Sequence, residues 1–186
     1  SIGNCYSTCS VTGSGDIVGG LVAYTRGNST TVSNCYSTGS VTGNGSVGGL
    51  LGYHYQGTVS NSYSTGSVTG ASDVGGLVGY LRTNSIVSNS FYNSTTSGQS
   101  DTGKGTPKTT AEMKVASPFT AAGWDFEEDL NGNDNGTSGG ASGNGTDNYW
   151  DMIQDGNNYP VLSWQDGATI LVTDLTATTI TIATTL

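Results

Sequence analysis

The sequence predicts an all-β protein whose main part is a parallel β-solenoid of about three to four rungs. Two sequence blocks recur in register along the first half of the chain, and they are punctuated by glycine. Of the 186 residues, 30 are Gly, only 33% are hydrophobic and 10% are charged. Such a composition does not suit a thick helical core, and it favours short stacked strands joined by turns.

The first block starts with Asn and contains Tyr-Ser-Thr and Val-Thr-Gly. Its copies begin at Asn4, Asn34 and Asn61, and a fourth, incomplete copy begins at Asn89. The starts lie 27 to 30 residues apart. Helical repeats of this period are excluded, because each internal Gly would cost a helix about 1 kcal/mol relative to Ala.

The second block is Val-Gly-Gly-Leu followed by a Tyr, and its copies begin at Val18, Val47 and Val74. Alternation in the first block places Val41 inside the coil and the row Thr38, Ser40 and Thr42 outside. Val47 and Leu50 are further predicted core residues. The Gly pair between them lets backbone approach backbone, or turns a corner at positive φ.

Stacking the copies about 4.8 Å apart would place equivalent residues above one another. The predicted apolar interior is made of Val11, Val41 and Val68 with Leu21, Leu50 and Leu77. One aromatic column would contain Tyr6, Tyr36, Tyr63 and Phe91. A second would contain Tyr24, Tyr53 and Tyr80. The Asn that opens each copy would form a ladder at a bend, since Asn tolerates unusual φ.

The three cysteines are Cys5, Cys9 and Cys35, an odd number that leaves at least one without a partner in the chain. Cys5 and Cys35 occupy the same repeat position, so their separation near one rung is compatible with a disulfide. The alternative is a pair of small buried hydrophobic residues.

These blocks resemble the GLUG-motif repeat, whose core is carried here by Gly49-Leu-Leu-Gly52 and Gly76-Leu-Val-Gly79. The first copy departs from it with Gly20-Leu-Val-Ala23. The stretches 108–114, 123–126 and 159–164 together also resemble the segment that closes such arrays. The resemblance implies a large extracellular bacterial or archaeal protein, often an adhesin, with β-helical stalk or display modules. The family also includes secreted peptidases whose repeats lie outside the catalytic domain.

A cap is expected after the repeats. Thr109 and Glu112 match a capping box, which predicts a short helix over residues 110–116 that ends before Pro118 and covers the open end of the solenoid. The expected division is residues 1–97 for the solenoid, 98–167 for the cap and 168–186 for a Thr-rich strand segment. That last segment would begin another domain or pair with an adjacent subunit.

Oxygen-bearing side chains alternate in the loop that contains Asp129, Asn131, Asn133 and Asp134. Such a set suits Ca²⁺, so calcium is the one cofactor that the sequence suggests. The loop departs from the EF-hand pattern, because Asp134 stands where Gly is needed and no Glu closes the frame. We favour a solvated insertion and keep the calcium site as the alternative.

The charge balance restricts the partners. The formal net charge is −9 with only 5 Lys and Arg, which argues against nucleic acid and anionic membranes as partners. The sequence holds no apolar run long enough to span a bilayer, so we expect no membrane span. Surface glycans and other protein subunits remain as candidate partners. Because the chain begins inside a repeat, Ser1 is interpreted as a processing or fragment boundary.

We predict that the chain is not an enzyme. His54 is its only histidine, and it is expected to be exposed at a coil corner without a nucleophile beside it. Asp16 and Asp73 recur at related positions, but Ser46 takes that place in the middle copy, as in a variable turn. The motifs of metalloproteases, serine hydrolases and phosphate loops are missing from the sequence.

The sequence therefore predicts an extracellular, cell-surface structural or adhesive module. The main alternative is a homopolymer, a filament assembled head-to-tail through the open first rung. Binding of ice or crystalline polysaccharide by the Thr-Ser-Thr face is less favoured. Five Asn-x-Ser/Thr sites are glycosylation candidates, at Asn28, Asn44, Asn93, Asn135 and Asn144.

Overall fold

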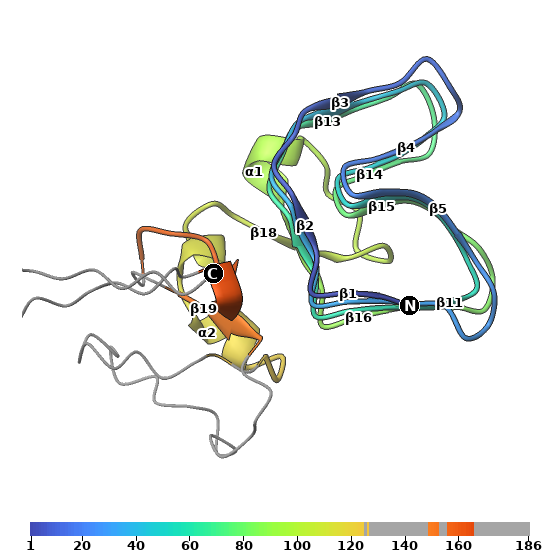
Figure 1. Cartoon of the computed structure of the whole chain (residues 1–186). Coiled ribbons are helices and arrows are strands. Elements are labelled where there is room, and N and C mark those ends of the chain that lie inside the picture. Colours follow the sequence, from blue (N-terminus) through green and yellow to red (C-terminus); the bar gives the residue numbers. More distant parts are fainter. Residues whose placement is uncertain (125, 127–148, 153–155, 166–186) are drawn as a thin grey trace, which may run out of the picture.

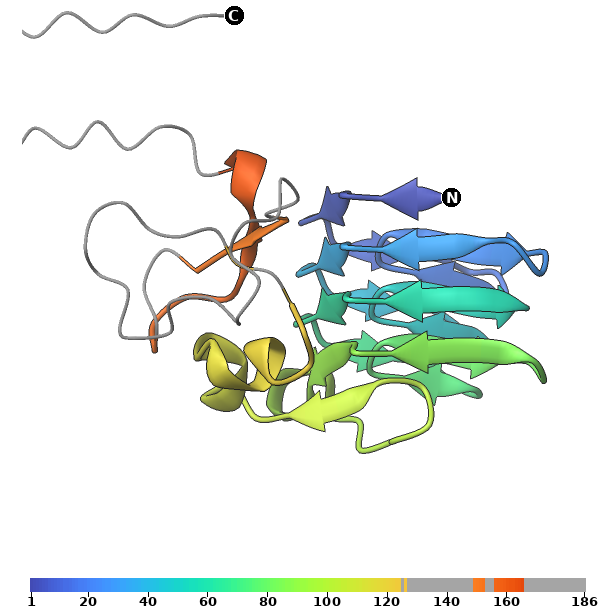
Figure 2. The ribbon, with the colours of Figure 1, turned by 90° about the horizontal axis from the view of Figure 1, so that it is seen from below.

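A computed structural model describes residues 1–124, 126, 149–152 and 156–165. Its main part is a parallel β-solenoid, as predicted, in which successive coils lie on top of one another (Figures 1 and 2). Each complete coil contributes five short strands, and equivalent strands of neighbouring coils pair in parallel. The repeat period of the sequence is therefore the length of one coil.

The strands follow the repeat. The first rung consists of β1 (Ile2–Gly3), β2 (Tyr6–Ser7), β3 (Val11–Thr12), β4 (Ile17–Gly19) and β5 (Val22–Arg26). The second consists of β6 (Thr31–Ser33), β7 (Tyr36–Ser37), β8 (Val41–Thr42), β9 (Ser46–Gly48) and β10 (Leu51–Tyr55). The third consists of β11 (Gly57–Ser60), β12 (Tyr63–Ser64), β13 (Val68–Thr69), β14 (Val74–Gly75) and β15 (Val78–Leu81). An incomplete fourth rung adds β16 (Ser85–Ser88) and β17 (Phe91–Asn93).

Neighbouring rungs pair without a slip in register. Tyr36 lies between Tyr6 and Tyr63, and Val41 lies between Val11 and Val68. Because the side chains of a strand alternate between two faces, a shift by one residue would turn every core residue outward. The same residue type at each repeat position thus fixes which strand face is buried.

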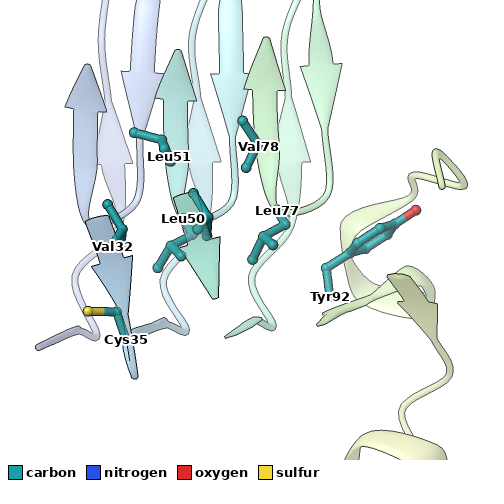
Figure 3. Close-up of a cluster of buried hydrophobic side chains, with 8 residues drawn as sticks. Val32, Cys35, Leu50, Leu51, Leu77, Val78 and Tyr92 are labelled. Atoms are coloured by element: carbon teal, nitrogen blue, oxygen red, sulfur yellow. The ribbon is translucent and has the colours of Figure 1, made fainter. Parts of the chain in front are cut away.

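The interior of the coil is divided into two apolar clusters. The larger one contains Val32, Cys35, Leu50, Leu51, Val59, Leu77, Val78 and Tyr92 (Figure 3). The smaller one contains Val18, Val41, Val47 and Val68. The expectation that Val41, Val47 and Leu50 are core residues is confirmed, since all three are fully buried. Two clusters form because β4 and β14 run back beside β5 and β15, which indents the coil (Figure 1).

The Gly pair sits at this indentation. A Cβ at Gly49 would overlap the carbonyl oxygen of Gly76 in the next rung, and one at Gly48 would overlap that of Leu51. Neither glycine has a positive φ. Of the two expected reasons for the pair, the close approach of backbone to backbone is therefore the one that applies.

Positive φ occurs instead at the Asn ladder. The φ angles of Asn4, Asn34, Asn61 and Asn89 are 53°, 51°, 44° and 47°. Each Asn follows a strand of the β1–β6–β11–β16 sheet and turns the chain toward the next strand. Asn is among the few residues other than Gly that tolerate this left-handed conformation, which explains why it opens every copy.

The C-terminal part lies mostly beside the solenoid (Figure 2), although β18 (Thr106–Lys108) pairs with β17 at the end of the stack. Its described elements are α1 (Ser94–Ser97), β18 (Thr106–Lys108), η1 (Glu112–Lys114), α2 (Ser117–Thr120), β19 (Trp150–Asp151), β20 (Val161–Leu162) and η2 (Ser163–Gln165). Met113, Phe119, Trp124 and Trp150 pack against the outward aromatic column of the β2–β7–β12–β17 sheet. The helical turns and aromatic residues of the expected cap lie against this column and not over the end of the solenoid, because the column supplies a large apolar surface that they cover.

The C-terminal end of the solenoid is closed by the loop before β18. The Lys104 Nζ donates to the carbonyl oxygens of Val74 and Gly79, at 3.0 and 2.6 Å. The carboxylate of Asp101 accepts from the backbone N–H of Gly76 at 3.2 Å. These side chains satisfy backbone groups of the third rung, so they reduce the unpaired edge at this end.

The helix predicted over residues 110–116 is also wrong in extent. The capping box forms, since Thr109 N–H donates to Glu112 Oε2 at 2.7 Å and Glu112 N–H donates to Thr109 Oγ1 at 3.3 Å. Only one 3₁₀ turn follows, and Val115 is extended. A separate helix, α2, begins at Ser117, because Pro118 suits the first turn of a helix and not its interior.

Truncation of one rung of the leucine ladder tests this packing. Leu50→Ala will lower the free energy of unfolding by about 3 kcal/mol, because Leu50 is fully buried between two rungs. Leu21→Ala is the matched control at the same repeat position, and its cost will be smaller because Leu21 is only partly buried in the first rung. Urea denaturation measures both values. Equal losses would contradict the packing described here.

Candidate functional site

The first aromatic column is structural. The Tyr6 and Tyr36 ring centroids lie 5.2 Å apart, and those of Tyr36 and Tyr63 lie 5.0 Å apart in a stacked arrangement. The Tyr63 hydroxyl donates to the carbonyl of Pro160, and the Tyr36 hydroxyl donates to Gln165 Oε1 at 2.8 Å. Burial raises the pKa of both phenols. This column attaches the C-terminal part, and little of it is left for a ligand.

The second aromatic column is exposed. Tyr24, Tyr53 and Tyr80 lie on the outer face of the β5–β10–β15 sheet, with centroids 5.3 and 4.8 Å apart. Tyr24 is 43% exposed and Tyr80 is 38% exposed. Within the described residues, no segment of the chain packs over these rings as the C-terminal part packs over Tyr36 and Tyr63. The column is therefore open to other molecules.

Both arginines of the chain flank this column. Arg26 lies 5.3 Å and Arg82 lies 4.6 Å from the centroid of the Tyr55 ring. Hydrogen bonding to Tyr53, with smaller contributions from Tyr55 and Tyr80, raises the pKa of Arg82. Neither arginine forms an ion pair within the described part of the chain. We call Tyr24, Tyr53, Tyr80, Arg26, Tyr55 and Arg82 the tyrosine–arginine face.

Sequence reasoning missed the arginines, although a signal was present. Arg26 and Arg82 each follow a column tyrosine by two residues, and Tyr55 holds the same place in the middle copy. Residues two apart on a strand point to the same face. The exposed tyrosine column therefore predicts a second exposed row, Arg-Tyr-Arg, directly beside it.

A shallow groove of about 350 Å³ runs beside the column. One wall is Tyr53, and the other is formed by turns of three successive rungs, which contribute Asp16, Asn44 and Asp73. All three turn residues are exposed. The groove thus crosses the rungs, with Tyr53 on one side and the carboxylates of Asp16 and Asp73 on the other.

His54 does not lie where the sequence suggested. It is fully buried in β10, and its Nδ1 lies 2.6 Å from the Thr25 Oγ1 of the rung before. Burial lowers the pKa of the imidazole. The expectation of an exposed corner is wrong because Tyr53 and Tyr55 take the outward positions, which leaves His54 facing inward.

The disulfide that the sequence allows between Cys5 and Cys35 is not present. Cys5 and Cys35 are free thiols, and each donates to a backbone carbonyl two residues before it, on Gly3 and Ser33, at 3.1 Å. Burial raises the pKa of Cys35 to about 11, which keeps it protonated. In this structure the pair takes the alternative role of small apolar residues at the coil interior.

The glycosylation candidates fall into three groups. Asn28 and Asn44 are exposed in turns. Asn93 is fully buried, accepts from the backbone N–H groups of Thr95 and Thr96, and donates to Thr110 and Tyr159. An attached sugar would break these bonds, so the candidate at Asn93 is wrong. Asn135 and Asn144 lie outside the described residues.

The calcium candidates Asp129, Asn131, Asn133 and Asp134 and the segment 168–186 also lie outside the described residues. Among the residues that are described, no cluster of three or more His, Cys, Asp or Glu side chains is placed to hold a metal ion. Nor does this part of the chain contain a helix with the length and apolarity needed to cross a membrane.

Comparison with known families identifies the repeats. Residues 14–42 and 43–69 match the family described as the GLUG motif. Residues 14–69 are GLUG repeats. Each match begins at the end of the first block of one copy and ends with the first block of the next, so each GLUG unit includes one Gly-Gly indentation and the first block of the next rung.

A stretch of 45 residues is 60% identical to a candidate Gly-rich membrane protein of Evansella cellulosilytica. It makes up 24% of this chain and 5% of that protein. The chain is also similar to the crystal structure of a candidate immunoglobulin A1 protease from Bacteroides ovatus, with a TM-score of 0.53 and 19% identity. That match covers 86% of this chain and 56% of the other, and at this identity it shows the fold alone.

The burial of His54 predicts a pH dependence of stability. In the unfolded chain the imidazole has its ordinary pKa of 6.5, and burial lowers this pKa in the folded chain. Below that pH the unfolded state binds a proton that the folded state does not. The free energy of unfolding is therefore highest above pH 6.5 and falls as the pH drops below it. Replacement by an uncharged side chain, His54→Gln, will flatten the loss of unfolding free energy between about pH 7 and pH 5.5. Urea midpoints at several pH values measure it, and equal slopes for both proteins would contradict the burial.

Proposed function

We propose that this chain is a non-catalytic structural and adhesive module on the outside of the cell. The observation that carries the proposal is the tyrosine–arginine face, which presents the same repeat positions from three stacked rungs to solvent. The β5–β10–β15 sheet that carries it is paired in parallel register. A fixed array of this kind supports contact with another molecule.

The chemistry of the described residues supports a role without catalysis. A general base is most often a histidine, and the single histidine of the chain is buried against Thr25. The exposed carboxylates Asp16 and Asp73 lie in turns of different rungs, on one wall of an open groove. A glycosidase needs two carboxylates that flank the bond to be cleaved, and both of these stand on the same side.

The first rung supports a solitary module over a head-to-tail filament. A Cβ at Gly39 or Gly66 would overlap a carbonyl oxygen of the rung before, so glycine is required where a preceding rung stacks. The first copy carries Cys9 at this position. It also carries Ala23, whereas the next two rungs carry Gly52 and Gly79 at this position. A Cβ at these two glycines would lie 2.7 and 2.6 Å from a carbonyl oxygen of the preceding rung. The first rung is therefore built to end the stack.

The other end supports the same conclusion. Lys104 already donates to Val74 and Gly79, two carbonyl groups that a following rung would use for pairing. A second copy could stack there only by displacing a charged side chain from its hydrogen bonds, which is costly. Both ends thus oppose the filament that the sequence left open as the alternative.

The extracellular location rests on the GLUG repeats and on the exposed Asn28 and Asn44. The resemblance of the repeats implies proteins of the cell surface, and the Evansella relative is described as a candidate Gly-rich membrane protein. Sugars attached at Asn28 and Asn44 would decorate turns that no described residue covers.

The state of association tests the proposal. Sedimentation velocity of the purified chain will give one species at the monomer mass of 18.9 kDa, and electron micrographs will show isolated particles. Restoring glycine at the first rung and removing the blocking lysine, in the variant Cys9→Gly, Ala23→Gly, Lys104→Ala, will promote concentration-dependent association. Fibres formed by the unaltered chain would overturn the proposal in favour of the filament.

A further inference from the structure

We propose that the tyrosine–arginine face binds a carboxylated polysaccharide, with one extended sugar chain laid across the rungs beside the Tyr24–Tyr53–Tyr80 column. The inference rests on the proposed adhesive function, and it names the class of ligand that this function requires.

The distribution of cations points to a carboxylate. The chain has a net charge of −9 and only five basic side chains. Lys104 is bonded to backbone carbonyls, Lys108 lies 3.8 Å from the Glu112 carboxylate, and Lys114 lies over the Tyr159 ring. The two arginines are exposed, lie on the same face and form no ion pair with a described residue. A guanidinium binds a carboxylate through two parallel hydrogen bonds, which makes this group its best-matched partner.

The arginines are held in place before a ligand arrives. Arg26 approaches Tyr55 from the rung before, and Arg82 approaches it from the rung after. A guanidinium stacked on an aromatic ring still offers its N–H groups at the edge. Holding these long side chains against Tyr55 and Tyr53 reduces the entropy that a ligand would otherwise have to remove.

The spacing of the charges fits a sugar chain. Arg26 and Arg82 belong to the first and third rungs, so they lie about 10 Å apart along the axis, two strand spacings. Each sugar of an extended β-linked polysaccharide lengthens the sugar chain by about the spacing between two neighbouring rungs. A polymer with a uronic acid at every second sugar would therefore present its carboxylates at the interval of the two arginines.

The opposite wall favours sugars over other anionic polymers. Asp16 and Asp73 carry exposed carboxylates across the groove from Tyr53, and they can accept hydrogen bonds from sugar hydroxyl groups. The same carboxylates, with the net charge of the chain, repel a densely sulfated chain or a nucleic acid. A peptide that adds a strand needs a free sheet edge, whereas the central strand β10 is paired on both sides.

Oligosaccharide binding to the full chain tests the inference, with a hyaluronan octasaccharide as the probe. It carries a carboxylate on every second sugar. A cello-oligosaccharide of the same length is the uncharged control, and a heparin octasaccharide is the sulfated one. Titration calorimetry will show that the hyaluronan octasaccharide binds more tightly than either the cello-oligosaccharide or the heparin octasaccharide. Tighter binding of either control would overturn the assignment of a carboxylated sugar.

Variants localise the binding. The double variant Arg26→Gln, Arg82→Gln will weaken hyaluronan binding by at least about tenfold. The double variant Arg26→Lys, Arg82→Lys will keep only part of the affinity, because an ammonium group cannot form the two parallel hydrogen bonds that a guanidinium forms with a carboxylate. Lys108→Gln removes one positive charge from the C-terminal part and will leave binding unchanged. Equal affinity in the unaltered chain and the double Gln variant would overturn the inference.

The failure of the inference is separable from that of the proposed function. A chain that sediments as a monomer and binds none of the three oligosaccharides removes the sugar ligand and leaves the structural module in place. Fibres of the unaltered chain remove the proposed function, whatever the oligosaccharides do.

Discussion

The structure depends on one constraint, the close approach of the backbones of successive rungs. Glycine is required where one rung meets another, at Gly49 in the indentation and at Gly39 and Gly66 after the second and third Tyr-Ser-Thr, because a Cβ there would overlap a carbonyl oxygen of the neighbouring rung. This approach brings equivalent strands to hydrogen-bonding distance and equivalent side chains into contact. The stacked tyrosines, the leucine ladder and the Asn bends are all consequences of it, since each needs the same residue at the same height in every coil.

The solenoid uses aromatic stacking for two purposes. The column that contains Tyr36 and Tyr63 is covered by the C-terminal part, which turns a sheet face into a second core. The column that contains Tyr24 and Tyr53 stays open and is flanked by Arg26. One geometric device thus gives both stability and a surface for recognition, and the flanking residues decide which role each column takes.

The repeat allowed the architecture, the rung register and both aromatic columns to be predicted, because identical residues at a fixed period specify which positions meet. The position of the C-terminal part was not predictable in this way. It depends on contacts such as that between Tyr63 and Trp150, which are far apart in sequence and follow no period. The burial of His54 was missed because this segment was interpreted as an exposed coil corner, whereas His54 lies within strand β10. The arginines were missed because they occupy a repeat position in only two copies.

Cross-linking tests the stacking of the rungs most directly. In a background with Cys5, Cys9 and Cys35 replaced by Ala, cysteines introduced at Thr42 and Thr69 lie opposite each other on β8 and β13. They will form a disulfide readily under mild oxidation. Cysteines at Thr42 and Thr31 are closer in sequence but lie on different sheets, so they will not. A disulfide between positions 31 and 42 in place of one between 42 and 69 would contradict the in-register solenoid.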